Sequence, residues 1–127
     1  MDSQDFYKRL MEAQNLMTNE KYKDALIILD ELKQIEKDGD FDYELVHKLY
    51  QLSSNASSFY NQQIILQKLA LLVETKNRSS IDIQELGECL REEEGLDLNS
   101  NILKRELELL ILRDLASFRM EGNKLIL

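Results

Sequence analysis

The last thirty residues constrain the fold more than any other part of the sequence. Successive residues of a helix are about 100° apart, so apolar residues of Leu98–Leu127 fall into two groups. One side of the helix carries Leu103, Leu107, Leu110 and Ile111. Roughly the opposite side carries Ile102, Leu109, Leu112 and Ala116. Because a helix that is apolar almost all round is expected to be buried on more than one side, we expect helix Ile102–Ala116 to be covered on both faces.

A β-hairpin is predicted directly after this helix. Beyond Ala116 the pattern becomes alternating, with Phe118 and Met120 on one side and Arg119 on the other. A turn around Gly122, a residue that readily adopts a positive φ, then leads into the returning strand 124–127. At the other end of the helix, Asn99 or Ser100 is placed to accept a hydrogen bond from the first turn.

Composition favours a folded, mainly helical chain. Hydrophobic residues make up 43% of the 127 residues, and there is no proline to interrupt a long helix. The length suits one domain, or two small ones that share a core. The net charge of −8 is spread evenly, because residues 1–77 and 78–127 each carry −4. An acidic surface disfavours non-specific binding to nucleic acid or to an anionic membrane.

Cysteine usage and the absence of targeting signals predict a location in a reducing compartment. Cys89 is the single cysteine, which excludes an internal disulfide and a thiolate zinc site. The N-terminus begins with acidic residues and lacks the pattern of a signal peptide. The apolar runs are far shorter than the ~20 residues of a membrane span. We therefore expect a soluble, cytoplasmic protein with no membrane association.

Two amphipathic helices, from about Asp5 to Thr18 and from about Tyr22 to Lys37, open the chain. Their short connection predicts an antiparallel hairpin. Six residues of this hairpin fall at the packing positions of a tetratricopeptide repeat: Ala13, Leu16, Tyr22, Ala25, Leu29 and Leu32. The hairpin resembles one such repeat, although Arg9 replaces its usual early aromatic residue and Lys37 its closing proline.

The middle of the chain is predicted as two further helices. Residues 38–44 carry alternating carboxylates that resemble the start of a calcium loop, but Tyr43 and Leu49 replace its required Gly and Glu. A polar turn is the favoured interpretation, with Asp40 or Asp42 capping the next helix. The Ser- and Asn-rich stretch 53–58 predicts a break or kink. Residues 59–73 then form a central helix that is apolar on most faces.

A boundary near residues 74–80 leads into a second helical segment. Ile81–Ile83 predicts a very short strand, and Asp82 followed by Glu85 resembles a capping box. The helix that follows is expected to end near Arg91, with Gly95 as its C-terminal cap and residues 92–94 as a solvated acidic face. The predicted domains are 1–77 and 78–127, folded as one compact body.

The order strand, helix, helix, strand, turn, strand in about fifty residues resembles the winged-helix fold. The resemblance lies in residues 81–86, 98–107 and 115–127, and the short stretch 92–97 between the two helices departs from it. A winged helix after tetratricopeptide-like helices also resembles the PCI modules of the proteasome lid, the COP9 signalosome and translation initiation factor 3. That resemblance implies a role in subunit assembly.

Two functions are therefore open. The first is a non-enzymatic protein-interaction or assembly module, a homodimer or a subunit of a larger complex. Its partner-binding residues would be Ile102, Leu109, Leu112 and Ala116. The alternative is a winged-helix DNA-binding transcription regulator. Its nucleic-acid contacts would be Lys104, Arg105, Arg119 and Lys124. Interleaved Glu106, Glu108 and Glu121 leave the local charge near neutral, which disfavours the alternative.

No catalytic, cofactor or metal motif is found. His47 is the only histidine, and its polar neighbours predict a surface position. Cys89 lies on the inner stripe of its helix and is expected to be a small core residue rather than a nucleophile. We predict a mainly α protein: an N-terminal helical hairpin and a central helix packed on a C-terminal winged helix with a small β-hairpin, without enzymatic activity.

Overall fold

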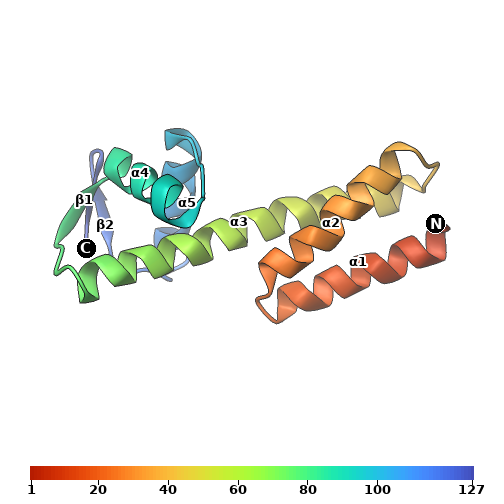
Figure 1. Cartoon of the computed structure of the whole chain (residues 1–127), viewed down its shortest axis with the longest axis horizontal. Helices are drawn as coiled ribbons and strands as arrows, with labels where there is room; N and C mark the ends of the chain where they lie inside the picture. Colours follow the sequence, from red (N-terminus) through yellow and green to blue (C-terminus); the bar gives the residue numbers. More distant parts are fainter. The chain divides into compact units, whose positions relative to one another are not determined.

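The computed structural model describes all 127 residues and contains five helices and one small sheet (Figure 1). The helices are α1 (Ser3–Thr18), α2 (Tyr22–Lys37), α3 (Tyr43–Glu74), α4 (Ile83–Glu94) and α5 (Ser100–Leu112). The strands are β1 (Ser80–Asp82), β2 (Arg119–Glu121) and β3 (Lys124–Ile126). The predicted mainly α chain with a small antiparallel β element is thus confirmed, whereas the winged-helix assignment stays a prediction.

Packing divides the chain into two compact units, Met1–Tyr60 and Asn61–Leu127, which we call the first and second units. Helix α3 supplies residues to both. Each unit has its own set of buried apolar side chains. The predicted domain boundary at residues 77/78, and the expectation of one compact body, stay predictions.

The first unit is built on the antiparallel hairpin of α1 and α2 (Figure 1). The predicted bounds of α2 are confirmed, and α1 begins at Ser3, where the Asp2 carboxylate accepts a hydrogen bond from the Asp5 N–H at 2.8 Å. The buried core is formed by Phe6, Leu10, Ala13, Ala25, Ile28, Leu29, Leu32, Leu49 and Ala56. Those on α1 and α2 recur at helical spacing, so the hydrophobic pattern indicated which side of each of these helices is apolar.

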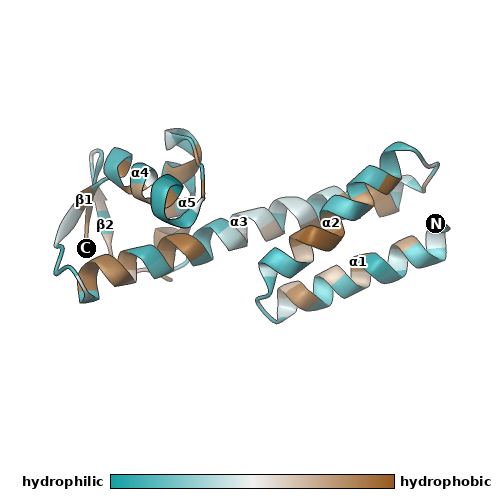
Figure 2. Cartoon of the chain, viewed as in Figure 1, coloured by the Kyte–Doolittle hydropathy of each residue, from teal (hydrophilic) through white to brown (hydrophobic).

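Helix α3 is continuous, so the predicted break at residues 53–58 is wrong. Ser53 and Ala56 are buried and small. Packing of this kind overrides the weak helix propensity of serine and asparagine, which is only a minor contribution to helix stability. The residues predicted as two helices therefore form a single element of 32 residues. Figure 2 shows apolar residues recurring along its second half.

The second unit contains the sheet, whose strand order is β1-β3-β2. Both strand pairs are antiparallel, and Leu125 of the central strand lies opposite Ile81 and Met120. The core joins this sheet to the second half of α3 and to α4 and α5. Its buried residues are Ile65, Leu69, Leu72, Ile81, Ile83, Leu86, Leu90, Leu103, Leu107, Leu110, Phe118 and Leu125.

Several predicted caps and turns of the second unit are confirmed. The Asp82 carboxylate accepts a hydrogen bond from the Gln84 N–H at 3.0 Å, and Asn99 Oδ1 accepts one from the Ile102 N–H at 2.8 Å. Gly95 and Gly122 have φ values of 68° and 61°, as expected for a helix cap and a hairpin turn. The predicted capping box is not formed as such, because Glu85 pairs with Arg78 instead.

Two helix ends differ from the prediction. Helix α4 continues to Glu94 rather than stopping near Arg91, because buried Lys68 of α3 forms ion pairs with Glu93 and Glu94 and so offsets the unfavourable charge at the helix end. Helix α5 stops at Leu112 rather than reaching Ala116. There Asp114 adopts a φ of 56°, and the Leu115 N–H bonds back to the Leu110 carbonyl at 3.1 Å.

Candidate functional site

The two apolar sides of α5 have different surroundings. Leu103, Leu107 and Leu110 are at most 1% exposed, as predicted for the inner face. On the outer face, Ile102 and Leu109 are half-buried and Leu112 is 81% exposed. Both faces of the helix were expected to be buried, but no other part of the chain covers the outer face at this end.

Ala116 does not lie on the outer face of α5, because the helix ends four residues earlier. Instead it packs against the core of the second unit. Of the four predicted partner-binding residues, Leu112 is the one that is largely exposed. Whether any of the four binds a partner stays a prediction.

An apolar groove of about 260 Å³ lies between the second half of α3 and the segment that follows α5. Leu66, Ala70 and Val73 line one wall, and their spacing places them on a single stripe of α3. Leu115, Ala116 and Phe118 line the other wall. Val73 is 43% exposed and Leu115 is 57% exposed, so the groove opens to the surface.

Sequence reasoning missed this groove. The signal was present in the stripe Leu66, Ala70 and Val73, which repeats at the spacing of a helix face. The sequence also predicted that Leu71 and Val73 belong to a central, covered helix. Leu71 is instead 51% exposed.

A partly buried polar cluster lies beside α5. Glu106 is 1% exposed, and its Oε2 accepts a hydrogen bond from Gln62 Nε2 at 3.0 Å. Gln62 Oε1 accepts a hydrogen bond from Arg113 Nη1 at 3.3 Å. The cluster links α3 to both the middle and the end of α5. Glu106 is therefore a structural carboxylate rather than one of the exposed acids that interleave with the predicted nucleic-acid contacts.

The four predicted nucleic-acid contacts are all exposed. Lys104 and Arg105 lie on α5, whereas Arg119 and Lys124 lie on the two strands of the hairpin. Two of the four have acidic neighbours: Arg119 Nη2 is 3.2 Å from Glu121 Oε1, and Arg105 Nη2 is 3.6 Å from Glu106 Oε1. Their charge is partly compensated, so they do not form a strongly basic face.

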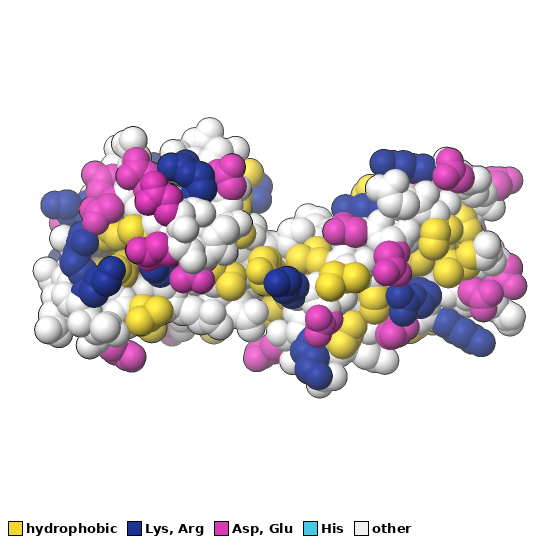
Figure 3. Space-filling model, in the orientation of Figure 1, with side chains coloured by type: hydrophobic (Ala, Val, Ile, Leu, Met, Phe, Trp, Pro, Cys, Tyr) yellow, Lys and Arg dark blue, Asp and Glu magenta, His cyan; other side chains and the backbone are white.

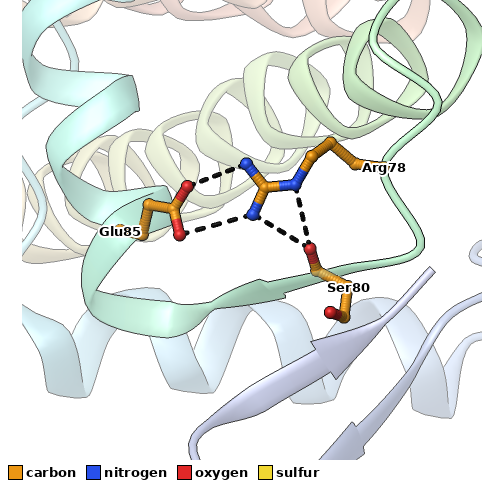
Figure 4. Close-up of polar contacts among 3 residues, drawn as sticks. All are labelled: Arg78, Ser80 and Glu85. Carbon is orange, nitrogen blue, oxygen red and sulfur yellow. Dashed lines mark hydrogen bonds and ion pairs between the residues drawn. The ribbon is translucent and has the colours of Figure 1, made fainter.

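Helix α4 is strongly acidic. It contains Glu85, Glu88, Glu92, Glu93 and Glu94 against a single Arg91, and Figure 3 shows acidic side chains gathered over it. At its first turn, Arg78 Nη1 donates to Glu85 Oε1 at 2.9 Å, and Arg78 Nε and Nη2 donate to the Ser80 carbonyl (Figure 4). The hydrogen bonds from Arg78 hold the pKa of Glu85 below its usual value. This contact ties the segment before β1 to α4.

His47 and Cys89 were the remaining candidate residues from the sequence. His47 is exposed, as predicted, and stacks on Tyr43 with ring centroids 6.0 Å apart. Cys89 is half-buried rather than fully enclosed. No group of three or more His, Cys, Asp or Glu side chains is placed to hold a metal ion. None of the helices combines the length and hydropathy needed to cross a bilayer.

Comparisons with protein families, with curated proteins and with solved structures gave no match.

Proposed function

We propose that this chain is a non-enzymatic protein-interaction module that docks partner subunits, or a second copy of itself, through the apolar surface of its second unit. The observation that carries the proposal is the exposure of large apolar side chains there. Leu71, Val73, Leu112 and Leu115 are between 43% and 81% exposed. Val73 and Leu115 line the apolar groove, whereas Leu71 and Leu112 are exposed on the second unit outside its lining. Exposed apolar side chains of this kind are a recurring feature of protein interfaces.

The winged-helix assignment of the second unit is part of this proposal. The order β1, α4, α5, β2, β3 and the antiparallel pairing of all three strands support it. A relationship to PCI modules would place this unit among subunits of larger assemblies. Its support is the sequence resemblance together with the helical hairpin of the first unit.

The test is association of the full chain measured by sedimentation and by cross-linking in its native extract. We expect self-association or a copurifying partner, and we expect a Val73→Asp, Leu112→Asp double variant to abolish it. The matched control is Ile27→Asp on α2, because Ile27 is similarly exposed at 54% but lies in the first unit. A strictly monomeric protein without a partner would contradict the proposal.

The second candidate is DNA binding, favoured by the exposure of Lys104 and Arg105 on α5 and of Arg119 and Lys124 on the hairpin. A salt-dependent band shift that is weakened by a Lys104→Glu, Arg105→Glu double change would support it, because phosphate contacts lose affinity as salt rises. Absence of binding at low salt would remove this candidate.

A further inference from the structure

Three exposed aromatic side chains form a stripe along the first half of α3, outside the surface discussed above. Tyr43, His47 and Tyr50 are spaced four and three residues apart, which places them on one side of the helix. Tyr43 is 78% exposed and Tyr50 is 45% exposed. Tyrosine is enriched among the residues that supply most of the binding energy at protein interfaces.

The sequence next to this stripe is acidic. Asp38, Asp40 and Asp42 lie in the link between α2 and α3, and Glu44 lies in the first turn of α3. None of these four carboxylates is in an ion pair. The cations nearest in sequence are Lys37 and Lys48, so acids outnumber lysines in residues 37–48. We call Tyr43, His47, Tyr50 and these four carboxylates the acidic aromatic face.

The chain itself already places a cation on this stripe. Lys33 Nζ of α2 lies 5.4 Å from the centre of the Tyr50 ring, within the range of a cation–π interaction. The Tyr50 hydroxyl donates a hydrogen bond to Glu36 Oε2 at 3.2 Å. An ammonium group, an aromatic ring and a carboxylate therefore meet at Tyr50. Tyr43 has a comparable ring, which is stacked on that of His47, and the carboxylates lie close to it in the sequence. The lysine over an aromatic ring in this unit is on Tyr50, not on Tyr43.

We propose that the acidic aromatic face binds an arginine- or lysine-rich segment of a partner protein, with a cationic side chain on the Tyr43 ring and the carboxylates 38, 40, 42 and 44 around it. Cation–π attraction to the ring and charge attraction to the carboxylates act together on such a segment. The face belongs to the first unit, so this interaction is independent of the docking surface proposed above.

The test is fluorescence anisotropy of the full chain with a short labelled peptide of alternating arginine and serine, compared with the same peptide carrying glutamate in place of arginine. We expect only the arginine peptide to bind. Tyr43→Ala should weaken its binding by about two- to fivefold, whereas Tyr43→Phe keeps the ring and should leave binding nearly unchanged. A combined Asp40→Asn, Asp42→Asn change should weaken binding and flatten its dependence on salt.

The matched control is Tyr7→Ala on α1, since Tyr7 is also exposed, at 49%, but lies outside the face. All variants are checked for unchanged helix content by circular dichroism. The proposal is overturned if the arginine peptide fails to bind at low salt, or if Tyr43→Ala has no more effect than Tyr7→Ala. It is also overturned if Tyr43→Ala abolishes self-association in sedimentation, because a second copy of the chain would then be the occupant.

Discussion

The two apolar faces of α5 have similar compositions but different surroundings. Leu107 on the inner face is fully buried, whereas Leu112, little more than one helical turn later, is 81% exposed. A leucine contributes to stability only in proportion to the area that it removes from water. The contrast shows that an apolar pattern on a helix identifies residues that need a cover, without deciding whether the same chain supplies it.

The largest effect on stability is expected from a substitution on the inner face of α5. Leu107→Ala should lower the free energy of unfolding by about 2–5 kcal/mol, because it removes a buried side chain and leaves a cavity. The matched change Leu112→Ala should alter it by no more than about 0.5 kcal/mol, as is usual for surface positions. Urea unfolding followed by circular dichroism measures both. Equal losses of unfolding free energy at the two positions would contradict the difference in burial between the two faces.

A smaller effect on stability should distinguish Glu106 from Glu108, both on α5. Glu106→Ala removes a buried acceptor and leaves Gln62 Nε2 without that hydrogen bond, so we expect a loss of about 1–3 kcal/mol. Glu108 is exposed two residues later, and Glu108→Ala should be close to neutral. The same urea titration provides the comparison, and a neutral Glu106→Ala would show that the buried cluster does not stabilise α5.

The smallest effect concerns the exposed ion pair between Arg78 and Glu85. Because Arg78 lowers the pKa of Glu85 in the folded chain, the contribution of this carboxylate is present at neutral pH. This contribution is lost in acid. The loss begins as the pH falls to about 4.3, the usual pKa of a glutamate, and continues as the pH falls through the lower pKa of the folded state. Solvent screening keeps this contribution small.

This pH dependence is measured as the difference in unfolding free energy between the wild type and Glu85→Gln. The difference should be detectable at neutral pH and should shrink in acid, where the wild-type side chain is also uncharged. A difference that grew as the pH fell would mean that the ion pair does not stabilise the fold.

Local sequence signals located most of the elements. The 3.6-residue apolar period gave α2 its observed bounds, and Asp82, Asn99, Gly95 and Gly122 marked ends and turns that the structure contains. These signals work because caps and tight turns depend on the conformational preferences of one or two residues. They need no information about distant parts of the chain.

The errors occurred where a local signal was absent or was overridden. Helix α5 ends through Asp114 in a left-handed conformation, a role that glycine usually marks in a sequence. Helix α3 continues through Ser53 and Ala56 because both are buried. Helix α4 continues to Glu94 because buried Lys68 offsets its terminal acids. The groove also escaped prediction, since its walls are far apart in the sequence.

The sequence by itself determined where most of the helices and strands lie, which side of each helix is apolar, and how acidic the chain is. Those properties follow from the order of side chains along a backbone with few allowed conformations. Only the tertiary structure decided which apolar sides are covered, that Glu106 is buried while Glu108 is exposed, and that Val73 and Leu115 face one groove. Burial depends on which segments meet in space, and that depends on the packing of the whole unit rather than on any local preference.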